Sequence, residues 1–197
     1  MGQAKLPVVF LSIVLTAGMV VFFGRTLFFS ESIEQPSEAA LGANLLQNKL
    51  IDEAGAEVMF DAIEFNSPLP LRASLLVFWA TWCAPCIEEI PLILDRQKNY
   101  DLRGVRTVFI NFDNGTLERS KRNDVREWLR KNNIVSEHQA SFETFFDPQE
   151  NLLKELNVTA LPYNVLMDAL GNVVWAEYGE LSFEELDKAI QTLANGR

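Results

Sequence analysis

The only two cysteines of the chain, Cys83 and Cys86, stand three residues apart in the run Trp-Cys-Ala-Pro-Cys. A nearly continuous apolar run over residues 74–79 precedes them, and apolar residues at helical spacing follow from Pro85 to Tyr100. This pattern predicts a strand buried on both faces that leads into a helix, with the cysteines at the junction. One helical turn brings two side chains at this spacing together.

A thiol at the first position of a helix faces unpaired N–H groups and the positive end of the helix dipole, which stabilise the thiolate and lower the pKa of the thiol. Cys83 occupies that position, so we assign it as the attacking nucleophile. Cys86 lies one turn further along, where we expect it to be more buried. We assign it as the thiol that resolves a mixed disulfide.

Two other uses of the cysteine pair are weaker. A structural disulfide that closes a loop of about four residues removes only roughly 2 kcal/mol of unfolded-chain entropy. A zinc site needs four ligands, or three and a water, and beyond the cysteines the chain offers a single histidine, His138. We therefore favour redox chemistry at Cys83 and Cys86, with neither a metal nor a cofactor.

The elements around the cysteines predict an α/β fold with a central mixed sheet flanked by helices. A second strand candidate over residues 105–112 completes a strand–helix–strand unit, which implies parallel pairing and a right-handed crossover. The last helix should begin with a capping box, Ser182-x-x-Glu185, and end at Gly196. The remaining predicted elements are hairpins over residues 50–60 and 163–178 and helices over residues 117–131 and 149–156.

Residues 6–24 form an uncharged apolar run of nineteen residues. A helix of that length covers about 28 Å, close to the thickness of a bilayer's hydrocarbon core. A buried core helix is rarely apolar on every face over this length. A cleaved signal peptide has a shorter apolar region, about 7–15 residues, and a small-x-small site that Ser30-Glu31-Ser32 imitates poorly. We expect a membrane anchor with a transmembrane helix over residues 1–25, a tether over residues 26–44 and a folded domain over residues 45–197.

The charges predict on which side of the membrane the domain lies and which class of partner it does not bind. Lys5 and the α-amino group precede the apolar run, so the positive-inside rule keeps the N-terminus in the cytoplasm, although Arg25 on the other side weakens the bias. The chain is then a single-pass protein of the cytoplasmic membrane whose domain faces the periplasm or the cell exterior. A net charge of −10 repels phosphate backbones, which excludes nucleic acid as an expected partner.

The run Phe-Trp-Ala-Thr-Trp-Cys-Ala-Pro-Cys over residues 78–86, continued by Glu89 and Pro91, resembles the thioredoxin superfamily. Within it, the chain is most similar to the membrane-anchored TlpA/ResA/CcmG-like thiol-disulfide oxidoreductases, over residues 45–195. The resemblance implies a thioredoxin-like fold for this part of the chain.

The same resemblance implies a role for Pro162, in Thr-Ala-Leu-Pro over residues 159–162, as a cis-proline that faces the cysteines. Spacing alone leaves a trans proline at the start of a strand as the alternative, because only about 5–6% of X-Pro bonds are cis. Trp82, Leu161 and Tyr163 then become candidate substrate-binding residues.

The sequence departs from thioredoxins at two positions. Val77 occupies the place of the buried aspartate that helps to move the proton of the resolving thiol in thioredoxins. Glu89, three residues after Cys86, is the candidate for that task, and the alternative is an acid favourably placed in the early helix. Tyr163 replaces the usual threonine after the proline, where it either shapes the substrate groove or packs.

The resemblance implies dithiol–disulfide exchange with protein substrates, in the reducing direction, with targets such as apocytochrome c or a copper-site assembly protein. Reduction outside the cytoplasm also requires a transmembrane electron donor. Potentials on this fold span about −270 to −120 mV, so a disulfide oxidase or isomerase remains an alternative. A copper-binding chaperone on the same fold is the other, although such sites use a wider cysteine spacing and a histidine, for which only His138 is available.

Overall fold

A computed structural model describes residues 45–63, 65, 67, 69–113, 119–133 and 142–195, without the side chains of residues 119–123. All of them belong to the second of the two units into which the chain divides, residues 36–197. The elements in chain order are β1 (Lys49–Ile51), β2 (Glu57–Met59), the 3-10 helix η1 (Phe60–Ala62), β3 (Ala73–Trp79), α3 (Ala84–Asp101), β4 (Val105–Asn111), α4 (Arg119–Lys131), β5 (Thr144–Phe146), α5 (Asn151–Glu155), β6 (Tyr163–Asp168), β7 (Val173–Tyr178) and α6 (Phe183–Asn195).

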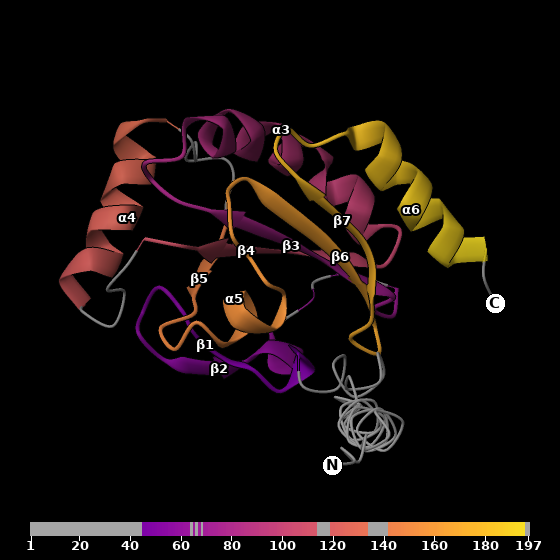
Figure 1. Cartoon of the computed structure of the whole chain (residues 1–197), viewed down its shortest axis with the longest axis horizontal. Helices are drawn as coiled ribbons and strands as arrows, with labels where there is room; N and C mark the ends of the chain where they lie inside the picture. The colour runs from indigo at the N-terminus through magenta and orange to yellow at the C-terminus, as the bar shows by residue number, and fades with distance from the viewer. Residues whose placement is uncertain are drawn as a thin grey trace, which may run out of the picture. The chain divides into compact units, whose positions relative to one another are not determined.

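The strands of the described residues form one mixed sheet in the order β2-β1-β5-β4-β3-β6-β7 (Figure 1). At its centre β3 is buried along its whole length, parallel to β4 and antiparallel to β6. The strand–helix–strand unit β3–α3–β4 and the hairpin β6–β7 are therefore confirmed. Because β3 and β4 are parallel and β6 is antiparallel to both, β3 and β4 end at the edge of the sheet where β6 begins.

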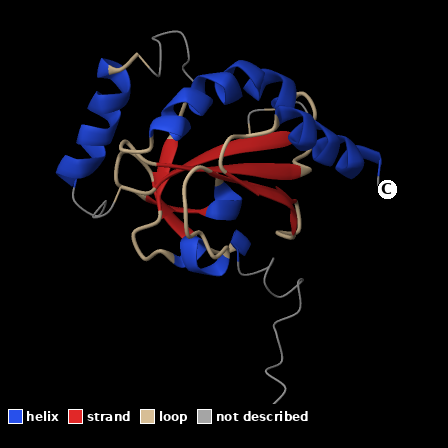
Figure 2. Cartoon of the chain, turned by 45° about the horizontal axis from the view of Figure 1, so that its top comes forward, coloured by secondary structure: helices blue, strands red, loops and turns tan. Residues whose placement is uncertain are grey.

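Two apolar clusters fill the two faces of the sheet, because successive side chains of a strand point to opposite sides. Leu75, Val77 and Trp79 of β3 pack on the face covered by α3, α4 and α6. Leu76 and Phe78 pack on the other face, with α5 and η1. Figure 2 shows the helices on either side of the strands. Both faces of the sheet are thus packed along β3, the strand that leads to the cysteines.

Three details of the described residues differ from the sequence prediction. β5 is a short strand that we did not predict, and it pairs with β4 and β1. Phe60 begins η1 instead of continuing the first hairpin. The capping box is only half formed, because Ser182 Oγ accepts from the Glu185 amide at 3.4 Å while the Ser182 amide donates to Glu177 Oε2 at 2.9 Å.

The predicted anchor and tether, His138 and Gly196 lie outside the described residues. Among the helices that the structure does describe, none has the length and apolar character needed to cross a membrane.

Candidate redox site

Cys83 and Cys86 form a disulfide at the start of α3, with their Cα atoms 5.3 Å apart. Cys83 is the N-cap residue of the helix, and its Sγ accepts a hydrogen bond from the Cys86 amide at 3.3 Å. Pro85 fits the first turn, where amides have no helical partner. Both cysteines are buried, Cys83 at 5% exposed and Cys86 at 2%. The predicted strand-to-helix junction is confirmed, and the amide that reaches Sγ is placed to stabilise a thiolate there.

The loop that leads into Cys83 is held by Asp113, which follows the end of β4. Asp113 Oδ2 accepts from the Thr81 amide at 3.0 Å, and Oδ1 accepts from the Thr81 hydroxyl at 2.9 Å. Asn111 supports the same carboxylate, because its Nδ2 donates to Oδ2 at 2.8 Å and its Oδ1 accepts from the Asp113 amide at 3.0 Å. Both oxygens of Asp113 are thus used to fix the residues just before the disulfide. We did not predict a role for this aspartate from the sequence.

The two tryptophans beside the site have opposite environments. Trp79 is fully buried, and its indole N–H donates to Thr144 Oγ1 at 3.0 Å. Trp82, directly before Cys83, is 65% exposed. A large apolar side chain held next to a nearly covered disulfide is available to a partner protein.

Pro162 stands directly before β6, and its peptide bond with Leu161 is cis, as the resemblance implied. Its neighbour Tyr163 pairs with Phe78 of β3, five residues before Cys83, so the proline and the cysteines share one end of the sheet. Leu161 is half-buried and packs against the apolar clusters of both faces.

Tyr163 lies in the core, only 7% exposed. Its ring stacks between those of Phe78, at 6.0 Å between centroids, and Tyr178, at 4.0 Å. The stack favours the packing alternative for Tyr163. Tyr178 is exposed and its hydroxyl donates to the Asn157 carbonyl at 2.8 Å, so it is the tyrosine of the pair that a partner can contact. Tyr178 could not be identified as a candidate from the sequence, because only its pairing with Tyr163 across β6 and β7 places it at the site.

Glu89 lies one turn after Cys86 on the same side of α3 and is 7% exposed. Its Oε1 accepts from Asn164 Nδ2 at 2.6 Å. Burial raises the pKa of Glu89 to about 7, although the hydrogen bond from Asn164 and the nearby Leu181 amide partly oppose the rise. This carboxyl can therefore change its charge near neutral pH, which an exposed glutamate does not do.

The nearby charges are negative. Glu177 of β7 and Glu180 in the following loop both raise the pKa of Glu89 further through like-charge repulsion. Glu177 is fixed by the hydrogen bond that it accepts from the Ser182 amide. Within the described part of the chain, no group of three or more His, Cys, Asp or Glu side chains is placed to hold a metal ion.

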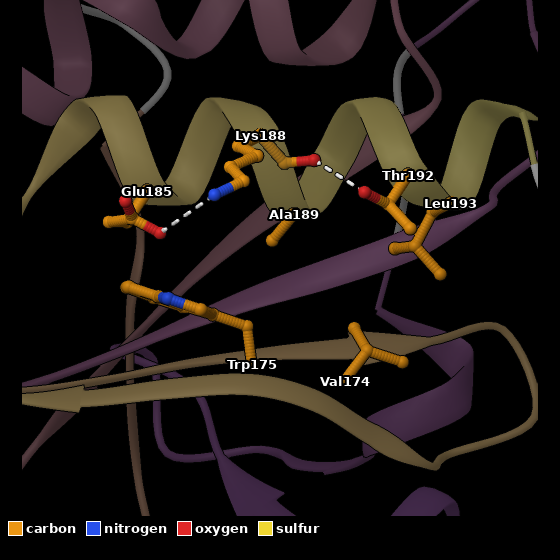
Figure 3. Close-up of a pocket in the computed structure, with 7 residues that line it drawn as sticks. All are labelled: Val174, Trp175, Glu185, Lys188, Ala189, Thr192 and Leu193. Carbon is orange, nitrogen blue, oxygen red and sulfur yellow. Dashed lines mark hydrogen bonds and ion pairs between the residues drawn. The ribbon is translucent and has the colours of Figure 1, made fainter.

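A separate hollow of about 430 Å³ lies between β7 and α6 and contains neither cysteine (Figure 3). Its walls include Val174 and Trp175 from the strand and Ala189 and Leu193 from the helix. Lys188 at its rim is paired with Glu185 at 3.9 Å. We do not count this hollow as part of the redox site.

The sheet order, the cis-proline and a disulfide at a helix start define a thioredoxin-like domain. The comparison with family models is specific: residues 59–190 match the Redoxin family, and the chain belongs to that family.

Individual relatives agree with this family. The chain is 25% identical over 122 residues to thiol-disulfide oxidoreductase ResA of Bacillus thuringiensis subsp. konkukian. The matched region is 62% of this chain and 64% of that protein. It is 23% identical over 123 residues to sporulation thiol-disulfide oxidoreductase A of Bacillus subtilis, covering 62% and 69% respectively. A solved structure described as thiol:disulfide interchange protein DsbE of Chlorobium tepidum is 25% identical, with a TM-score of 0.56 over 74% of this chain and 92% of that one.

Proposed function

We propose that this protein is a thiol-disulfide oxidoreductase that exchanges its Cys83–Cys86 dithiol with disulfides of other proteins. The observation that carries the proposal is Cys83 at the N-cap of α3, with the Cys86 amide directed at its sulfur. The exposed Trp82 and the cis peptide before Pro162 lie at the same end of the sheet and support it. The relatives named ResA and sporulation thiol-disulfide oxidoreductase A support the same chemistry.

In the reaction, the Cys83 thiolate attacks one sulfur of a substrate disulfide and the other substrate sulfur leaves as a thiolate. Cys86 then loses its proton and attacks Cys83 Sγ in the mixed disulfide. The second substrate sulfur leaves, and the Cys83–Cys86 disulfide forms. Two electrons have passed from the protein to the substrate, the proton of Cys86 has gone to a base, and the two substrate thiolates take up protons from solvent.

Glu89 is the group that we assign to the proton of Cys86. It lies one helical turn away on the same face, and its carboxyl changes charge near pH 7, the range in which a general base works best. We prefer this role in proton transfer to the alternative that Glu89 only interacts favourably with the helix dipole. An acid that serves only the dipole can stay exposed, whereas Glu89 is buried.

The acidic surroundings support the reducing direction. A thiol-disulfide protein is oxidising when its reduced, thiolate form is stabilised. Glu177 and Glu180 raise the pKa of Glu89 through like-charge repulsion. In our proposal the same negative charge also disfavours a thiolate at the cysteines, in opposition to the helix N-terminus. We therefore propose a reductase of protein disulfides, such as those of apocytochrome c or a copper-site assembly protein.

The location follows from the apolar run over residues 6–24. In our proposal it anchors the chain in the cytoplasmic membrane with the domain outside the cytoplasm, where electrons must come from a transmembrane donor. Reporter fusions after residue 44, one active only outside the cytoplasm and one active only inside, test the orientation. Activity of the cytoplasmic reporter alone would contradict it.

Trapping tests the exchange itself. In the full chain, Cys86→Ala keeps the attacking thiol but cannot resolve a mixed disulfide, so it should accumulate covalent complexes that a reductant releases. The matched control, Cys83→Ala, should accumulate none. Equal yields from the two variants would overturn the assignment of Cys83, and a redox potential near −120 mV would replace the reductase with an oxidase or isomerase.

A further inference from the structure

Glu89 and Asn164 share one hydrogen bond, and each side chain has a second polar atom without a partner. Glu89 Oε1 and Asn164 Nδ2 are 2.6 Å apart, but Glu89 Oε2 and Asn164 Oδ1 are both buried with no hydrogen-bond partner. Only two other buried side-chain oxygens of the described residues are in that condition, on Tyr100 and Thr107. Each member of this hydrogen-bonded pair thus has one buried oxygen without a partner.

A single proton removes both deficits. An ionised carboxylate and an amide oxygen are both acceptors, so they cannot satisfy each other. When Glu89 is protonated on Oε2, that oxygen becomes a donor and Asn164 Oδ1 can accept from it. The acid and the amide then make two hydrogen bonds side by side, Nδ2–H to Oε1 and Oε2–H to Oδ1.

We propose that Asn164 is a positioning residue that holds Glu89 in its protonated form, through a two-bond acid–amide pair, while Cys83 and Cys86 are joined as a disulfide. An unpaired buried polar atom destabilises the folded chain, so the pair is favoured over the ionised alternative, in which both oxygens stay unpaired.

Except for the Leu181 amide, which favours the charged form, the groups that face Glu89 favour a neutral carboxyl. Val77 on β3 is directly opposite Asn164 and is apolar. From β7 and the loop before α6, Glu177 and Glu180 repel a negative charge on Glu89. On α3 itself the nearest titratable group one turn away is Cys86, which does not titrate while it is in the disulfide.

The pair gives the proton a defined route, and this part of the inference rests on the proposed function. When a donor supplies two electrons to the Cys83–Cys86 disulfide, the S–S bond breaks and the proton on Glu89 Oε2 passes to Cys86 Sγ. One bond of the acid–amide pair is lost at that moment. In the reverse half of the cycle, Cys86 returns its proton to Glu89 as it attacks the mixed disulfide, and the pair forms again.

The direct test is carbon NMR of the oxidised full chain in mild detergent, with ¹³C in the side-chain carboxyl and carboxamide carbons of Glu and Asn. We expect the Glu89 carboxyl to be protonated at pH 6 and the Asn164 carboxamide carbon to titrate with the same midpoint. Replacement Glu89→Gln should abolish the Asn164 titration, whereas Glu88→Gln, at an exposed neighbour, should leave it unchanged. A Glu89 carboxyl that is ionised at pH 6, or an Asn164 signal that does not follow it, would overturn the proposal.

A stability cycle gives a second, independent readout. Glutamine at position 89 copies the protonated acid, because its amide can donate to Asn164 Oδ1 and its carbonyl can accept from Nδ2. At pH 8, Glu89→Gln should therefore raise the melting temperature of the oxidised chain, and the rise should disappear when Asn164→Leu is also present. An unchanged rise in the Asn164→Leu background, or a Glu89→Gln chain that melts earlier than the parent at pH 8, contradicts the acid–amide pair.

These readouts separate the pair from the proposed function. An active chain in which Glu89 is ionised at pH 6 overturns the pair and keeps the oxidoreductase. A protonated pair in a chain that never forms mixed disulfides supports the pair and overturns the oxidoreductase.

Discussion

Val77 and Asn164 lie directly opposite each other on β3 and β6, and the Asn164 side chain is hydrogen-bonded to Glu89 on α3. The resemblance to thioredoxins implies a buried acid at position 77 of β3. In this chain the corresponding acid is Glu89, which comes from α3 instead of the strand. An asparagine on the neighbouring strand holds it there. The proton of the resolving thiol thus has a candidate acceptor although position 77 is apolar.

Glu89 should make the stability of the oxidised chain depend on pH. Its pKa in the folded state, about 7, is above the ordinary value of 4.5, so between these values the folded chain binds a proton that the unfolded chain does not. The stability that this proton contributes is fully present below pH 4.5 and is lost as the pH rises to about 7. Urea unfolding from pH 4.5 to 8 should show this fall, with a slope of at most about 1.4 kcal/mol per pH unit. Asp147, another buried carboxyl whose pKa is raised by burial, adds to the fall. Glu89→Gln should flatten the part near neutrality, and parallel curves for the two chains would contradict this reading.

Asp113 should be needed for the position of the loop before Cys83. Asp113→Ala leaves the Thr81 amide and hydroxyl without their acceptor, which should cost about 1–3 kcal/mol of unfolding free energy. Because the loop carries the nucleophile, disulfide-exchange rates should fall by roughly tenfold to a hundredfold.

A matched control for Asp113 lies at the other end of the sheet. Asp168 accepts from the Leu170 and Asn172 amides in the β6–β7 turn, so Asp168→Ala removes a similar set of hydrogen bonds far from the cysteines. It should lower stability and leave the exchange rate unchanged. Equal loss of rate in both variants would show that Asp113 acts only through global stability.

Arg106 should stabilise the end of the sheet away from the cysteines. It is buried, and its guanidinium donates to the Ile63 carbonyl at 2.6 Å and to Ser74 Oγ at 3.0 Å. Arg106→Met should lower the unfolding free energy by about 1–3 kcal/mol, because it leaves those oxygens unpaired. The double variant with Ser74→Ala should lose less than the sum of the two single changes, since one unpaired oxygen is then absent. Additive losses would show that the guanidinium and the hydroxyl do not depend on each other.

Trp82 should matter for protein substrates and not for folding. Trp82→Ala should change the unfolding free energy by no more than about 0.5 kcal/mol, because the side chain is exposed. We expect KM for a protein disulfide to rise several-fold, while the rate with a small disulfide stays close to that of the parent. Leu170→Ala, an exposed apolar residue in the β6–β7 turn, is the control and should affect neither substrate. A Trp82→Ala chain that keeps the parent KM for proteins would remove Trp82 from the substrate surface.

The sequence was sufficient for the centre of the fold, because β3 and α3 carry long, regular apolar patterns that end at the cysteine pair. It was not sufficient for β5, whose three residues are too short to show alternation and gain their partners only from β4 and β1. The position of Cys83 at a helix N-cap was predictable from local chemistry alone.

The contacts around the site were less predictable. Glu89 was a candidate from its spacing, but its partner Asn164 is 75 residues away and depends on the register of β6 against β3. Tyr178 became visible only through its register opposite Tyr163. The membrane anchor over residues 1–25 stays a prediction, because it lies outside the described residues.

The most direct test of the account is the acidity of the Cys83 thiol in the reduced chain. The rate of iodoacetamide labelling of Cys83 in the Cys86→Ala variant, measured from pH 4 to 10, gives its pKa. We predict a midpoint clearly below the value of about 8.5 for free cysteine, together with loss of disulfide exchange in Cys83→Ser. A midpoint at or above that value, with Cys83→Ser as active as the parent, would contradict the account.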